Sequence, residues 1–133
     1  MGYSPKIWGP EAWHFIHFVA LNYPINPTIE DKRRYNKFFQ SLQHTLPCEG
    51  CAFNYSQKLK KNPPRLENRE SLFQWTVDIH NEVNIATGKP KITYDEALKR
   101  IDKKRDIQNL KDSFIITSGG FLFILFMFLV FRD

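Results

Sequence analysis

Apolar side chains recur every three or four residues along most of the chain, as expected of helices that each bury one face. The first such stretch runs from Trp13 to Leu21 and ends at Tyr23-Pro24. Thr28-Ile29-Glu30-Asp31, typical of a helical capping box, introduces a second stretch, which closes at Leu46-Pro47. The pattern therefore predicts two helices, one after the other, in the first third of the chain.

The same spacing predicts three more helices. Pro47 suits the start of a third helix, which runs from Cys48 to about Lys60, because the N–H that proline lacks is not needed there. Asn62-Pro63-Pro64 stops it, and Asn68 is a plausible N-cap for a fourth helix that ends near Gly88 and Pro90. The fourth helix carries the apolar set Leu72, Phe73, Trp75, Val77, Ile79, Val83 and Ile85, and Thr93 to Glu96 cap a short fifth helix.

No convincing run of alternating apolar and polar residues is present, so the sequence predicts no strands. We therefore expect an all-α fold, with a four-helix bundle plus a short fifth helix forming a domain over residues 1–110. The total length of 133 residues leaves room for one such domain and a short appendage.

That appendage is the stretch FIITSGGFLFILFMFLVF over residues 114–131, which carries no charge. A run of about 18 apolar residues is at the short end of what spans a bilayer, whereas the alternative is a helix buried in the protein core. We predict a transmembrane helix because a small bundle could hardly enclose a helix that is apolar all round. Residues 111–133 would then form a C-terminal membrane anchor.

Basic residues set the expected orientation of this anchor. Lys99, Arg100, Lys103, Lys104, Arg105 and Lys111 precede the apolar run, whereas only Arg132 and Asp133 follow it. By the positive-inside rule the bundle stays on the cytosolic side, and the N-terminus begins no cleavable signal peptide. The net charge of +5 could also suit nucleic acid, but the basic residues form no aromatic-interleaved patch, so we expect no nucleic-acid partner.

Cys48 and Cys51 are the only two cysteines and form a CxxC pair. Haem attachment is excluded because the pair is followed by Ala52 and not by histidine. A structural zinc site would need two further ligands, and no second CxxC or closely paired histidines are present.

Redox use of the CxxC pair fits better, because a helix N-terminus stabilises a thiolate and a helical turn brings both sulfurs within bonding reach. Transfer of electrons to oxygen would then require a cofactor held between helices, since no Rossmann glycine motif is present.

Four sequence blocks in a fixed order resemble the Erv/ALR family of FAD-dependent sulfhydryl oxidases. They are Trp8-Gly9-x3-Trp13-x3-His17, Tyr23-Pro24-x2-Pro27-Thr28, Leu46-Pro47-Cys48-x2-Cys51, and Trp75-x4-His80-Asn81-Glu82-Val83-Asn84-x3-Gly88-Lys89-Pro90. Together they cover most of residues 8–90. The resemblance implies a helical bundle that holds FAD, forms disulfides in partner proteins through the CxxC pair, and passes the electrons to oxygen to give hydrogen peroxide.

The resemblance also assigns roles to individual residues. It makes Cys51 the cysteine that meets the flavin and Cys48 the one attacked by the substrate thiolate. The residues expected to line FAD are Gly9, Trp13, His17, Cys51, His80, Asn81, Val83, Asn84 and Lys89, whereas Trp75 is expected in the protein core. Family members are commonly homodimers, and we expect the same here.

Two features of many family members are missing. The chain has no second, shuttle cysteine pair, so we expect its dithiol substrate to be a separate protein of the kind of a thioredoxin-like relay. It also lacks a structural disulfide, whose positions correspond to Val77 and Tyr94, where apolar packing could replace the bridge. Short chains of this kind look most like the virus-encoded members, which points to a virion or endoplasmic reticulum membrane of an infected cell.

A different class of function competes with this one. The chain could be a tail-anchored, non-catalytic adaptor that uses CxxC as a zinc clip or a redox-sensing contact. The colour of the purified protein discriminates between the two, because only the oxidase should be yellow with bound flavin.

Overall fold

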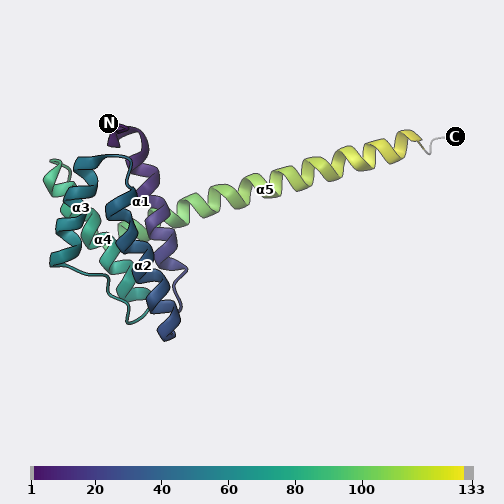
Figure 1. Ribbon diagram of the computed structural model, residues 1–133. Coiled ribbons are helices and arrows are strands. Elements are labelled where there is room, and N and C mark those ends of the chain that lie inside the picture. The colour runs from purple at the N-terminus through teal and green to yellow at the C-terminus, as the bar shows by residue number, and fades with distance from the viewer. Residues whose placement is uncertain (1, 131–133) are drawn as a thin grey trace. The chain divides into compact units, whose positions relative to one another are not determined.

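The fold was obtained as a computed structural model, which describes the backbone of residues 2–130 and the side chains of residues 2–112. Within that part of the chain all regular structure is helical, as predicted. The helices are α1 (Pro5–Leu21), α2 (Ile29–Thr45), α3 (Glu49–Lys61), α4 (Arg69–Ala86) and α5 (Tyr94–Val130). Figure 1 follows them in chain order from the purple N-terminus to yellow α5.

Helix α1 begins earlier than the apolar spacing indicates. Ser4 is its N-cap, and the Ser4 hydroxyl accepts a hydrogen bond from the Lys6 N–H. Pro5 follows as the first helical residue, where its fixed φ and missing N–H cost nothing. The cap therefore extends α1 by two turns ahead of Trp13, which brings Trp8 and Gly9 into the same helix as the apolar face.

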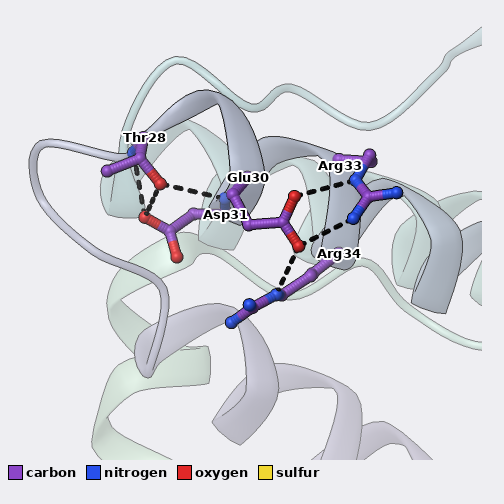
Figure 2. A network of polar contacts seen from close by, with 5 residues as sticks. All are labelled: Thr28, Glu30, Asp31, Arg33 and Arg34. Carbon is purple, nitrogen blue, oxygen red and sulfur yellow. Dashed lines mark hydrogen bonds and ion pairs between the residues drawn. The ribbon is translucent and has the colours of Figure 1, made fainter.

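Helix α2 starts with the predicted capping box, drawn in Figure 2. The Thr28 hydroxyl accepts a hydrogen bond from the Asp31 N–H, and the Asp31 carboxylate accepts from the Thr28 N–H at 2.9 Å. Hydrogen bonds from the Thr28 hydroxyl and N–H hold the pKa of the Asp31 carboxyl below its ordinary value. Within the same turn, Glu30 pairs with both Arg33 and Arg34 one turn further on, so the first turns of α2 are tied together by local polar contacts.

Helices pack most closely as two pairs, α1 with α4 and α2 with α3. Trp75 joins the pairs: it lies in the core at 1% exposure, as predicted, and its ring meets Phe39 of α2 edge-on at 4.9 Å. The buried Trp75 indole N–H donates to the Asn62 carbonyl after α3, which satisfies its only donor. The resulting bundle of α1 to α4 is the predicted one.

The fifth helix is not short, which corrects the prediction from sequence. Thr93 and Asp95 lie at its start as expected, but α5 continues for 37 residues to Val130. No glycine–proline stop separates residues 94–112 from the apolar run, so the backbone hydrogen-bond ladder has no reason to end there. Two compact units result, residues 1–94 and residues 95–133.

A membrane-spanning helix is not found among the residues whose side chains the structure describes. The predicted span over residues 114–131 lies outside those residues. It stays a prediction, as does the domain boundary between residues 110 and 111.

Candidate redox and cofactor-binding site

The CxxC pair lies at the start of α3. Cys48 is the N-cap in an extended conformation, and the helix proper begins at Glu49. A disulfide joins Cys48 to Cys51, with their Cα atoms 5.1 Å apart. The Cys51 N–H points at the Cys48 sulfur, with a nitrogen–sulfur distance of 3.2 Å. An N–H group and the helix dipole would both stabilise negative charge on Cys48, as predicted for the sulfur nearest the helix N-terminus.

Three of the predicted cofactor-lining residues meet between α1 and α4. Trp13 stacks on His80, with ring centroids 4.1 Å apart and an interplanar angle of 7°. His17, one turn after Trp13, lies with its Nε2 atom 3.2 Å from Nδ1 of His80. His17 is buried at 4% exposure, whereas Trp13 and His80 are half-buried. The structure thus brings together side chains that lie more than 60 positions apart in the sequence.

Thr76 completes this cluster and was missed by the sequence reasoning. Its hydroxyl donates to the Phe73 carbonyl at 2.7 Å, so it must accept the hydrogen bond from Nδ1 of His17, 2.9 Å away. His17 then carries a proton on Nδ1, while its Nε2 lies within hydrogen-bonding distance of Nδ1 of His80. The signal for Thr76 was its position: it is a polar residue one helical turn before His80, between the apolar residues Trp75 and Val77.

A continuous series of polar contacts thus joins His80 to His17, then to Thr76 and the Phe73 carbonyl. His80, at the half-buried end of this series, also stacks on Trp13. The series fixes how the His80 ring is turned relative to Trp13, so both rings present defined flat surfaces.

The other predicted cofactor residues occupy the same two helices and the turn after α4. Gly9 is half-buried on the Trp13 side of α1, and a Cβ added there would have no atom within 4 Å. Asn84, one turn after His80, is buried at 7% exposure, and Val83 is half-buried. The exposed Lys89 is fixed by its N–H, which donates to the Asn84 carbonyl across a turn in which Gly88 has φ +70°.

Asn81, which is predicted to line FAD, also bonds to the segment after α4. Its amide donates to the Ile92 carbonyl and accepts from the Ile92 N–H, both at 2.8 Å. This pair of bonds clasps the segment after α4 back onto the helix. Asn81 thus shapes the site by holding the 87–93 segment in place.

A second tie lies beside this clasp. Val77 is fully buried, whereas Tyr94 is 38% exposed. The Tyr94 hydroxyl donates to the Asp78 carboxylate at 2.7 Å, and Asp78 also pairs with Arg65. A hydrogen bond to Asp78, the residue after Val77 in α4, therefore connects these segments, and apolar packing between Val77 and Tyr94 stays a prediction.

These residues suit FAD on two observations. First, half-buried Gly9 leaves open space on the same side of α1 as Trp13, as a bound ring system would need. Second, stacked Trp13 and His80 present flat surfaces together with imidazole and amide hydrogen-bonding groups, which match a planar heterocycle. The donor set fits a flavin better than a metal, since no group of three metal-ligating side chains occurs among the described residues.

Comparisons with known proteins agree with this geometry. Residues 10–105 match the Erv1 / Alr family. The chain is 52% identical, over 103 residues, to a probable FAD-linked sulfhydryl oxidase of Acanthamoeba polyphaga mimivirus, covering 75% of this chain and 72% of that protein. It is 36% identical to the mitochondrial FAD-linked sulfhydryl oxidase ERV1 of Saccharomyces cerevisiae, over 62% of this chain and 44% of the yeast protein.

Among solved structures, the FAD binding domain of Erv1 from Saccharomyces cerevisiae aligns with a TM-score of 0.71 at 33% identity. The alignment covers 75% of this chain and 96% of the yeast domain. The CxxC pair and most of the helical bundle lie within residues 10–105, the range that matches the family. The chain therefore belongs to the Erv1/Alr family.

Proposed function

We propose that Cys48 and Cys51 are the redox-active pair through which this FAD-linked sulfhydryl oxidase forms disulfides in partner proteins. The observation that carries the proposal is the N-cap position of Cys48, in disulfide linkage with Cys51, in a chain of the Erv1/Alr family. The Cys48 sulfur accepts a hydrogen bond from the Cys51 N–H, which would stabilise a thiolate. A disulfide with a purely structural role has no need of such stabilisation.

Thiol–disulfide exchange at this pair begins with attack by a substrate thiolate on the Cys48 sulfur. The bond from Cys48 to Cys51 breaks, and Cys51 leaves as a thiolate. A second thiolate of the substrate then attacks its own sulfur in the mixed disulfide, which releases Cys48 as a thiolate. The substrate is thereby oxidised to a disulfide, and Cys48 and Cys51 are reduced by two electrons. Backbone N–H groups at the start of α3 stabilise the Cys48 thiolate as it forms.

FAD, when bound, supplies the chemistry that side chains lack, since it accepts two electrons from a dithiol and passes them to oxygen to give hydrogen peroxide. Trp13 and His80 would hold its ring system by stacking. Buried Asn84 offers an amide on the same face of α4, and Lys89 offers a positive charge for the phosphates. Thr76 and His17 hold the His80 ring in its orientation.

The physiological substrate would be a separate dithiol protein. Both cysteines of the chain are used in the Cys48–Cys51 disulfide, so no second pair is available to carry electrons from the protein surface. A thioredoxin-like relay is the kind of partner that suits a solitary, half-buried CxxC at a helix N-terminus. Gly50 and Glu49 between the cysteines are exposed, which leaves that side of the pair open to a macromolecule.

A homodimer and a membrane anchor complete the proposal. Ile7, Phe15 and Phe18 lie on the side of α1 opposite the Trp13 face and are between 43% and 74% exposed. An apolar helix face of this kind suits association with a second copy of the chain. Residues 111–133 would anchor the protein in a virion or endoplasmic reticulum membrane with the bundle on the cytosolic side, on the strength of the uncharged run and the basic residues before it.

Replacing Cys51 tests the central assignment. The variant Cys51→Ser should bind FAD and remain yellow, but it should lose turnover with dithiothreitol, measured as oxygen consumption. Without Cys51 the protein can form no internal disulfide for the substrate to reduce. Oxygen consumption by Cys51→Ser at the wild-type rate would contradict the assignment.

Ser56→Ala is a matched control on the same helix, because the Ser56 hydroxyl only bonds to the Phe53 carbonyl. It should keep both colour and turnover. A purified wild-type protein that is colourless and contains zinc would instead favour the non-catalytic adaptor, in which CxxC is a metal clip.

A further inference from the structure

The N-terminal residues lie against the loop that carries Cys48. The Tyr3 N–H donates to the Pro47 carbonyl, with a nitrogen–oxygen distance of 2.8 Å. Pro47 immediately precedes the redox cysteine and has no N–H of its own. The backbone at residue 3 is thus fixed one residue from Cys48, although more than 40 positions separate them in the sequence.

Gly2 makes the approach still closer. A Cβ added at Gly2 would lie 2.8 Å from the Pro47 carbonyl oxygen and 3.1 Å from the Cys48 Cα. Both are backbone atoms, which cannot move aside as the end of a flexible side chain can. Any larger residue at position 2 must therefore push the N-terminal segment away from Cys48.

The other end of the segment is held by α1. The Trp8 indole N–H donates to the Tyr3 carbonyl at 3.1 Å, and Ser4 caps the helix that follows. The Tyr3 peptide groups therefore bond on one side to Trp8 of α1 and on the other to the loop before α3. Residues Gly2 to Trp8 form a strap between α1 and the loop before α3.

This strap spans the two halves of the proposed site. The stacked and hydrogen-bonded cofactor residues belong to the pair α1 and α4, whereas the cysteines stand at the start of α3 in the other pair. Trp8 lies five positions before Trp13 on the same helix. The strap is thus a direct backbone link from the cofactor-lining helix to the residue beside Cys48.

We propose that the strap positions Cys48 for thiol–disulfide exchange, with Gly2 and Trp8 as its positioning residues. It fixes the extended backbone of Cys48, which in turn aims the Cys48 sulfur at the Cys51 N–H. That N–H stabilises the Cys48 thiolate of the reduced pair, so a loosened strap disfavours reduction. This inference rests on the proposed redox role of Cys48 and Cys51.

The test measures the disulfide itself in the full-length holoprotein. Protein is equilibrated without oxygen in mixtures of reduced and oxidised glutathione, where two glutathione thiols reduce the Cys48–Cys51 disulfide and form one glutathione disulfide. Alkylation and mass measurement then give the reduced fraction. Gly2→Ala should lower the equilibrium constant for reduction about threefold to tenfold, in the range expected for one lost hydrogen bond. Trp8→Phe keeps an aromatic ring but removes the indole N–H, and it should lower the same equilibrium constant about twofold to threefold.

Lys6→Ala is the matched control, since it removes an exposed side chain inside the strap without touching either bond. It should keep the wild-type equilibrium constant. Melting temperature and flavin content of every variant identify a folding defect, and Trp8→Phe decides the matter if Gly2→Ala does not fold. Equal constants for wild type, Lys6→Ala and Trp8→Phe would overturn the positioning role.

The outcome is separate from that of the proposed function. The wild-type protein could be reduced normally by glutathione and yet consume no oxygen with thiol substrates. That result would refute the oxidase mechanism, and the effect of the strap on the equilibrium constant could still be measured. Normal turnover of the wild type with strap variants of unchanged equilibrium constant would refute the strap alone.

Discussion

Thr76 is a residue whose role depends on its position and not on its reactivity. It is fully buried and accepts the Nδ1–H of His17, whose Nε2 lies 3.2 Å from Nδ1 of His80. A hydroxyl can donate to a helix carbonyl and accept from an imidazole at the same time. The orientation of two histidines in the proposed cofactor site therefore depends on one hydroxyl.

We expect Thr76→Val to destabilise the protein and to weaken retention of FAD. The substitution preserves shape but leaves Nδ1 of buried His17 without this acceptor, at a cost of about 1–3 kcal/mol in the free energy of unfolding. Urea unfolding and the flavin-to-protein absorbance ratio measure the two effects. Thr45→Val, which removes an exposed hydroxyl in the last turn of α2, is the control and should change stability by less than about 0.5 kcal/mol. Equal stability of the two variants would refute the role of Thr76.

At the scale of elements, the segment after α4 is held by polar contacts. Asn81 bonds to Ile92, and Tyr94, at the start of α5, donates to Asp78 of α4. Hydrogen bonds of this type do not depend on an oxidising environment, unlike a structural disulfide. The arrangement suits an enzyme whose bundle is proposed to face the cytosol.

Because of the hydrogen bond from Tyr94 to Asp78, we expect the stability of the fold to decrease at alkaline pH. The hydrogen bond to Asp78, together with burial and the Asp78 charge, raises the pKa of Tyr94 above its ordinary value of 10.0. Because the folded pKa is higher than the unfolded one, the stabilisation is present below pH 10 and is lost as the pH rises through the folded pKa.

Tyr94→Phe should therefore lower stability at about pH 8 and should show a smaller further loss than the wild type at about pH 11. Urea unfolding at both values measures this difference. Tyr3→Phe, which removes an exposed phenol away from Asp78, should keep the wild-type difference between the two pH values. The idea fails if Tyr94→Phe loses as much stability as the wild type between them.

At the scale of the whole molecule, the exposed apolar face of α1 predicts a dimer. Phe15→Lys combined with Phe18→Lys should convert dimer to monomer, because two charges would have to be buried at the interface. Light scattering of the full chain in detergent gives the mass. Ile29→Lys, at an 88% exposed position of α2, is the control and should remain dimeric. A wild-type chain that is monomeric would contradict the proposal.

The apolar run in residues 114–131 predicts that the full chain floats with liposomes and resists alkaline extraction. Leu125→Arg with Phe126→Arg places charge in the middle of the run, where each arginine opposes insertion by about 2.5–3.5 kcal/mol. This variant should be released into the soluble fraction. Leu110→Arg, outside the run, should stay with the membrane. Retention of the double variant in the membrane fraction would exclude a simple spanning helix.

The sequence alone determined the helical class, the bundle of four helices, the buried Trp75 and the position of Cys48 at a helix N-terminus. All of these depend on local spacing, caps and breakers, which act over a few neighbouring residues. The length of α5 was misjudged because no local stop signal bounds it, and the true start of α1 depended on a cap that apolar spacing does not reveal.

Only the tertiary structure decided which distant residues meet. The orientation of His17 and His80 depends on Thr76 across the interface of α1 and α4, and no spacing rule encodes that contact. The contacts of Asn81 with Ile92 and of Tyr94 with Asp78 are likewise visible only in the folded chain. The strap at Gly2 likewise arises from a close approach of backbones more than 40 residues apart, which packing alone brings about.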